Sequence, residues 1–299
     1  MQVPDQAPKT ERRNEKRKRQ GKEKAPGRTN EVQGVEELIT KPSIAVISGN
    51  GFDSYLKETS VDTQIHAFYK SHGIQKDRKF LAKDCKINSS HILFINRYSI
   101  GNIQGKSKSS PHEIDYKSMF VGLYQNGVDK IISLNMCGSL QKEMPPGSIT
   151  LIHDFIDFVN RDLTLDDLGL EIADMTIPFD QYISSLIKQT AKKEKIKLYD
   201  SIYVSLVDGS RLETPAEISF LRSITKESLV AGMEVATEAQ LAKLLNIRYA
   251  AIGVVTNYAT GLRQGKITQN SIEGSFDKSV SLVKNLLFGT ITRLANKNP

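Results

Sequence analysis

The chain has 299 residues, of which 39% are apolar, and this is enough for the core of a single α/β domain. Its net charge of +7 is uneven, because residues 1–30 carry ten Lys and Arg against four acidic residues, so the rest is almost neutral and shows no sign of a basic nucleic-acid-binding face. Cys85 and Cys137 have no C-x-x-C or metal-binding spacing, and no apolar run approaches the length of a membrane span. We therefore expect a cytoplasmic protein with reduced thiols and no membrane contact.

Residues 1–40 lack apolar periodicity and are rich in Lys, Arg, Glu, Gln and Pro. This composition predicts a disordered tail ahead of one folded domain over residues 41–299. The basic run Lys16–Arg19 is typical of a nuclear localisation signal or of a segment that binds RNA. The simpler interpretation is a solvated tail without a specific partner.

After the tail, short apolar runs alternate with helical patterns. Strands are predicted at residues 43–48, 91–96, 129–134, 148–153, 201–207 and 248–255. Helices are predicted at residues 111–126, 181–195 and 234–245, from Thr214 onward, and at 270–296. We expect Thr214 to cap its helix, with Pro215 in the first turn and Glu217 completing a capping box. The alternation predicts an α/β fold, with a twisted, mixed or mostly parallel sheet covered by helices on both faces. Residues 52–90 give no clear pattern.

Polar residues that suit a ligand stand where the apolar runs end. Gly49, Asn50 and Gly51 follow the first strand, where glycine amides can approach an anion closely. Arg97 ends the second strand and suits either an anion or a surface salt bridge. Later strand ends and helix starts carry Glu213, Met233, Glu234 and Asn257. The sequence shows no Ser/His/Asp set, Cys/His pair or metal cluster, so these groups suit polarising a neutral heterocycle beside an anion rather than covalent catalysis.

Five motifs stand in the same order as in the trimeric purine nucleoside phosphorylases, a family that includes the methylthioadenosine and methylthioinosine phosphorylases. In chain order they are Arg97 with Pro111–Tyr116, Asn135–Leu140 with Pro146-Gly147, Gly209–Glu217, Gly232-Met233 with Glu238-Ala239, and Thr256-Asn257. The chain therefore resembles this family from residue 43 to about residue 295. The resemblance implies a homotrimer that binds a purine nucleoside, uses phosphate as co-substrate and needs no cofactor.

The resemblance also implies roles for single residues. Glu213 would accept hydrogen bonds from the N1–H side of the purine. Asn257 would bond N7 and O6 and stabilise charge on the departing base, which favours a 6-oxopurine. The base and ribose would be lined by Leu212, Met233 and Tyr116. Phosphate would be held by the Arg97-Tyr98 position, the amides around Asn50 and the N–H of Met136.

The expected anion site departs from the family pattern at three positions. Asn50 replaces a Ser or Thr, Tyr98 replaces a His, and Glu234 replaces a Ser or Thr. A carboxylate about 4 Å from an anion costs on the order of 4 kcal/mol at a near-surface dielectric. A Met-Glu pair also occurs in the related hexameric phosphorylases and nucleosidases, where the glutamate binds the ribose hydroxyls. Glu234 is a candidate for that role.

Three hypotheses for the function follow. The first is phosphorolysis of a 6-oxopurine or methylthio nucleoside by a pentosyltransferase of nucleoside metabolism. The second is phosphate-independent hydrolysis by a nucleosidase. The third is a non-catalytic nucleoside-binding protein with a degraded phosphate site.

Overall fold

The computed structural model describes residues 43–49, 52, 60–87, 90–100, 110–168 and 172–296. The predicted tail over residues 1–40 lies outside the described residues, and so does Asn50. Among the helices that are described, none is long and apolar enough to cross a membrane.

Nine described strands form one mixed sheet. They are β1 (Ile44–Ser48), β2 (Ser60–Ser71), β3 (Ile74–Ile87), β4 (Ser90–Asn96), β5 (Lys130–Ser139), β6 (Ile149–Asp157), β7 (Leu198–Ser205), β8 (Leu229–Ala231) and β9 (Arg248–Tyr258). Their order is β2-β3-β4-β1-β5-β8-β7-β6-β9, and β9 also pairs with β5, so the strands from β5 to β9 close into a ring. Strand β1 runs parallel to β4 and β5, and β9 runs parallel to β5, whereas β2, β3 and β4 pair antiparallel. The predicted α/β class with a mixed sheet is confirmed.

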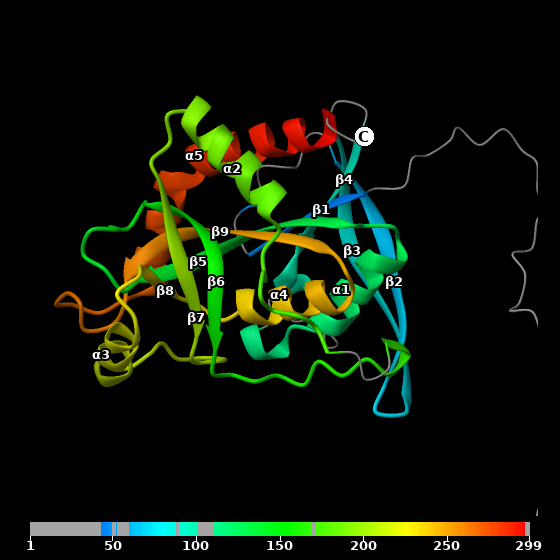
Figure 1. The fold of residues 1–299 in the computed structure, drawn as a ribbon, viewed down its shortest axis with the longest axis horizontal. Coiled ribbons are helices and arrows are strands. Elements are labelled where there is room, and N and C mark those ends of the chain that lie inside the picture. Colours follow the sequence, from blue (N-terminus) through cyan, green and yellow to red (C-terminus); the bar gives the residue numbers. More distant parts are fainter. Residues whose placement is uncertain are drawn as a thin grey trace, which may run out of the picture. The chain divides into compact units, whose positions relative to one another are not determined.

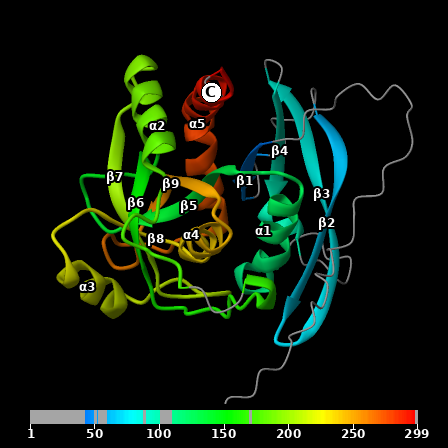
Figure 2. The ribbon, with the colours of Figure 1, turned by 45° about the vertical axis from the view of Figure 1, so that its right-hand side comes forward.

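Helices cover both faces of this sheet, as Figures 1 and 2 show. They are α1 (Tyr116–Gln125), α2 (Gln181–Lys193), α3 (Pro215–Ile224), α4 (Val235–Leu244) and α5 (Gln269–Asn296). The two faces of β1 explain this arrangement, because its side chains alternate between two apolar clusters. Ala45 and Ile47 pack in the cluster that contains α1 and α4, whereas Ile44 and Val46 pack in the cluster that contains α2 and α5.

The β2–β3 hairpin is the main element that the sequence pattern did not reveal. Its inward side chains, including Ile65 and Tyr69, are buried, while most of the side chains between them are exposed. The tip is a two-residue turn in which His72 (φ 50°) and Gly73 (φ 74°) both adopt left-handed backbone. Charged and polar residues on the exposed face dilute the apolar signal over residues 52–90, which explains why no strand was predicted there.

The start of α3 matches its sequence signature. Thr214 is the N-cap, its hydroxyl accepts from the Glu217 amide at 3.2 Å, and the Glu217 carboxylate accepts from the Thr214 amide at 2.7 Å. The predicted capping box is therefore confirmed. Glu213 precedes the helix directly, at the end of the loop that follows β7.

Candidate active site

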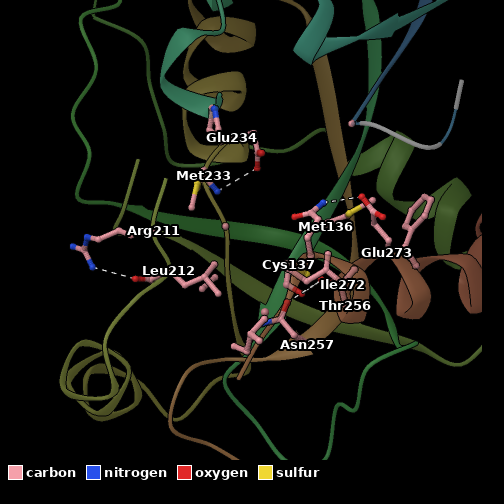
Figure 3. A pocket seen from close by; sticks show the side chains of 18 of the residues that line it. Met136, Cys137, Arg211, Leu212, Met233, Glu234, Thr256, Asn257, Ile272 and Glu273 are labelled. Carbon is pink, nitrogen blue, oxygen red and sulfur yellow. Dashed lines mark hydrogen bonds between the residues drawn. The ribbon is translucent and has the colours of Figure 1, made fainter. Parts of the chain in front are cut away.

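A cavity of about 720 Å³ lies where several elements of the sheet end. The ends of β5 and β9 contribute Met136–Gly138 and Thr256-Asn257. The loop before α3 contributes Gly209–Glu213, and the segment between β8 and α4 contributes Ala231–Glu234. Figure 3 shows Ile272 and Glu273 of α5 on a further side. Because the parallel strands β5 and β9 end at the same edge, their terminal side chains meet in this cavity.

Glu213 is one of the two residues predicted to recognise the base, and it lines this cavity. It is only 7% exposed although it is a carboxylic acid. Burial raises the pKa of the Glu213 carboxyl above its ordinary value, because the charged form loses hydration. The carboxyl is therefore held at the cavity wall in an environment where a hydrogen bond from a ligand N–H is strong.

Asn257, the second predicted base-recognition residue, lies at the end of β9, beside a register shift in the pairing of β9 with β5. The shift falls between Cys137 and Gly138, and Gly138 leaves room for the amide, since a Cβ there would lie 3.0 Å from Asn257 Nδ2. Asn257 Oδ1 accepts from the Thr256 hydroxyl at 2.9 Å, and Nδ2 donates to the Tyr258 carbonyl at 3.0 Å. These bonds orient the amide and leave its second N–H for a ligand.

Glu234 and Tyr98, two of the three departures from the family pattern, contact each other. The Tyr98 hydroxyl donates to Glu234 Oε1 at 2.5 Å, while Oε2 accepts from the Tyr203 hydroxyl at 3.1 Å and the Met233 amide at 3.2 Å. Burial, followed by the Glu234 charge, raises the pKa of Tyr98, so its hydroxyl keeps the proton and acts as the donor. Glu234 is 7% exposed and stands at the N-cap of α4, where the helix dipole favours a carboxylate.

Arg97 reaches the cavity, but most of its guanidinium is bonded to buried protein groups. Nε donates to Glu238 at 2.8 Å, Nη2 to Ser133 at 2.8 Å and to Glu238 at 3.4 Å, and Nη1 to the Leu134 carbonyl at 3.1 Å. Burial alone would lower the pKa of Arg97, but the carboxylates of Glu238 and then Glu234 outweigh it and raise that pKa. Arg97 is 1% exposed, and one of its five N–H groups has no partner among the described residues.

The remaining predicted residues divide into two groups. Met136, Leu212 and Met233 line the cavity with Glu213 and Asn257. Tyr116 is not among the residues that line this cavity, and its role at the pocket wall stays a prediction. Its ring is buried at the start of α1 and lies under the Arg161 guanidinium, 4.6 Å from ring centroid to Cζ.

Several lining residues were not predicted. The first turns of α5 contribute Gln269, Ile272, Glu273 and Phe276. Tyr203 of β7 does not line the cavity, but it donates to Glu234, which does. A helix that looks like a core element carries no local signal that one face borders a cavity. Over the residues that the structure describes, no group of three or more His, Cys, Asp or Glu side chains could hold a metal ion.

Comparisons with known proteins agree with this geometry. The Phosphorylase superfamily matches residues 110–292. The chain is 31% identical over 212 residues to a probable S-methyl-5′-thioinosine phosphorylase of Thermodesulfovibrio yellowstonii, covering 70% of this chain and 77% of the relative. It is 32% identical over 256 residues to a probable 6-oxopurine nucleoside phosphorylase of Dictyoglomus turgidum, covering 84% and 91%.

The fold is also similar to solved structures. A Schistosoma mansoni adenosine/methylthioadenosine phosphorylase mutant in complex with methylthioadenosine superposes with a TM-score of 0.72. The two chains are 20% identical, and the match covers 86% of this chain and 93% of the other. At this identity the likeness concerns the fold.

Proposed function

Because the chain belongs to the phosphorylase superfamily, we propose that it cleaves the N-glycosidic bond of a 6-oxopurine nucleoside or its methylthio analogue. Phosphate is the acceptor, and the products are the free base and a ribose 1-phosphate or methylthioribose 1-phosphate. The observation that carries this proposal is the convergence of Glu213 and Asn257 on one cavity. A carboxylate that accepts and an amide that donates match the N1–H and O6/N7 edges of a 6-oxopurine.

The reaction separates charge, and the cavity has groups for both sides. As the C1′–N9 bond breaks, its electron pair moves into the purine and the ribose becomes oxocarbenium-like. Asn257 Nδ2–H stabilises the charge that develops at N7 and O6, while Glu213 holds the opposite edge of the base. The carboxylate of Glu234 accepts from a ribose hydroxyl and favours the positive sugar. A phosphate oxygen then bonds to C1′.

Phosphate has donors on one side of the cavity. Arg97, Gly49 and Met136 all line the cavity, and one guanidinium N–H of Arg97 has no partner among the described residues. Gly49 packs closely here, since a Cβ at this position would lie 3.2 Å from Tyr98 Cε2 and 3.7 Å from Arg97 Nη1. No cofactor takes part in this proposal, since phosphate is a substrate.

Hydrolysis by water is the second candidate, and the pairing of Arg97 with Glu238 favours it. Within the described part of the chain Arg97 has a single unpaired N–H, and such a guanidinium binds an anion less well than one that offers two parallel N–H groups. The cavity is also lined by Glu234, Glu273 and Asp277, whose charges oppose a phosphate dianion. Water carries no charge and avoids that repulsion.

Base release measured with and without phosphate tests both candidates. Purified full-length protein is incubated with inosine, guanosine or methylthioinosine, and the free base is quantified by chromatography. Phosphate-dependent release of base and ribose 1-phosphate supports phosphorolysis, whereas equal release without phosphate supports hydrolysis. Absence of base release from all three nucleosides overturns the enzymatic proposal, and ligand-induced stabilisation in that case would indicate a binding protein.

The assembly and location also remain proposals. The family resemblance suggests a homotrimer in the cytoplasm, and light scattering of the full chain would measure its mass. The basic tail suggests an additional association with RNA or the nucleus. Deleting residues 1–40 should remove that association and leave catalysis intact.

A further inference from the structure

The loop that carries Glu213 is held by side chains rather than by backbone pairing. It spans residues 206–213, between the end of β7 and the cap of α3. Over the described part of the chain, no backbone–backbone hydrogen bond involves these eight residues. A loop without such bonds is free to shift unless side chains fix it, so the position of Glu213 depends on the contacts at the two ends of the loop.

Arg161 fixes the start of this loop. Its Nη2 forms an ion pair with Asp208, and its Nη1 donates to the Pro111 carbonyl at 3.2 Å. The side chains of Arg161 and Asp208 are 14% and 22% exposed, so both are partly covered, although Asp208 as a whole residue is exposed. Pro111 and Gly209 both line the cavity, and Arg161 therefore ties two parts of the cavity wall together.

The ring of Tyr116 supports the guanidinium from below. Arg161 Cζ lies 4.6 Å from the ring centroid, within the range of a cation–π contact. Tyr116 belongs to α1 and is 4% exposed, so it offers a rigid base. Arg161 thus joins α1, the Pro111 turn and the loop at residue 208, and a planar guanidinium can make these three contacts together where an ammonium cannot.

The wall around this junction is closely packed. Gly209 has φ +119°, and a Cβ at this position would lie 3.1 Å from His112 Nδ1. The end of the same loop is fixed by Arg211, which pairs with Glu217 through Nη1 at 2.8 Å and Nη2 at 2.9 Å. Glu213 therefore follows the Arg161–Asp208 pair in the chain and is spanned by the exposed Arg211–Glu217 pair.

We propose that Arg161 and Asp208 form a positioning pair that sets Glu213 against the purine and so determines the preference for a 6-oxopurine. This inference rests on the proposed function, because it assigns Glu213 to the base. Arg161 does not line the cavity and acts through the loop. Misplacing a binding group by about 1 Å can cost on the order of a hundredfold in rate, so loss of the pair should affect recognition more than folding.

Asp208→Asn tests the pair, with Asp200→Asn as the matched control. Asp200 pairs with Lys188 at 2.9 Å on an exposed surface, and neither residue lines the cavity. We expect Asp208→Asn to raise the KM for inosine roughly tenfold or more and to reduce the ratio of kcat/KM between inosine and adenosine. The control should change neither quantity.

Tryptic cleavage of the full chain after Arg211, followed by mass spectrometry, separates this inference from the proposed function. Asp208→Asn should accelerate this cleavage within the loop relative to Asp200→Asn, whether or not the wild type turns over a nucleoside. If Asp208→Asn does not fold, Arg161→Lys replaces it, since lysine keeps a positive charge beside Asp208 but loses the contacts to Pro111 and Tyr116. An unchanged rate of cleavage after Arg211 overturns the positioning pair, and so does an unchanged inosine-to-adenosine ratio in an active enzyme.

Discussion

The two halves of the cavity use polar side chains in opposite ways. On the side proposed to bind the purine, here called the base side, Glu213 and Asn257 line the cavity and have few hydrogen-bond partners of their own. On the side proposed to bind phosphate or water, here called the acceptor side, Arg97 is bonded to Glu238, and Tyr98 is bonded to Glu234. The base side is thus organised to bind a ligand, whereas the acceptor side already satisfies most of its own groups.

Tyr98 and Glu234, which depart from the family pattern expected from the sequence, both belong to the side whose groups are already paired. A polar group that is paired within the protein must give up that pairing, or share it, before it binds a ligand. If Glu213 and Asn257 bind the base as proposed, little rearrangement is required, whereas an anion must compete with Glu238 for Arg97 and lie near Glu234.

The buried ion pair of the acceptor side should matter most for stability. In Glu238→Ala the Arg97 guanidinium stays buried but loses its counterion. Removing one partner of a buried ion pair lowers the free energy of unfolding by about 3–5 kcal/mol. We expect a fall of this size in the free energy of unfolding, measured by urea denaturation.

Glu227→Ala is the control, because Glu227 pairs with His153 at 3.5 Å on the surface. A loss of stability in Glu238→Ala no larger than in this control would contradict the role of Glu238 as a counterion. It would also mean that Arg97 is easily released toward the cavity.

On the base side, Asn257→Ala should have the largest effect on catalysis. Removing one donor to developing negative charge typically lowers kcat by about 10²–10³. We expect a loss of this size for inosine, with little change in the unfolding midpoint, because Asn257 is half-buried at a strand end. An equal loss of stability and activity would assign Asn257 a structural role instead.

The motifs predict the fold and the presence of Glu213 and Asn257 at the ends of neighbouring elements, while the roles of both residues toward the base stay predictions. Glu213 is fixed by a capping box, and Asn257 follows a buried strand, so local sequence determines both positions. The acceptor side depends on pairs such as Tyr98 with Glu234 and Arg97 with Glu238, which are 136 and 141 residues apart in the chain. No local pattern carries such contacts. The contact of Tyr116 with Arg161, 45 residues along the chain, is another that no local pattern carries.

Restoring the family pattern on the acceptor side should improve the use of phosphate. The double variant Tyr98→His with Glu234→Ser removes a carboxylate from the cavity and supplies two small donors. We expect the KM for phosphate to fall about tenfold, which corresponds to about 1.4 kcal/mol.

The single variant Tyr98→Phe serves as the control for this change. It removes one hydrogen bond to Glu234 and leaves the charge in place. A KM for phosphate that stays unchanged in the double variant would show that Glu234 does not oppose the anion, and would favour its role on the ribose.

The smallest expected effect is the loss of folding stability that the buried carboxylate of Glu213 causes at neutral pH. Burial raises the pKa of Glu213 above 4.5, so the folded protein binds this proton more tightly than the unfolded chain does. This contribution to stability is fully present below pH 4.5 and is lost as the pH rises through the folded-state pKa.

At pH 7 the wild type therefore buries a charge that Glu213→Gln does not. We expect the variant to have a slightly higher unfolding midpoint at pH 7 and a midpoint equal to that of the wild type below pH 4.5, while its kcat/KM for inosine falls. Thermal unfolding of both proteins from pH 4 to pH 8 measures the difference, and a gap that does not change with pH would mean that the carboxyl is already paired, as on the acceptor side.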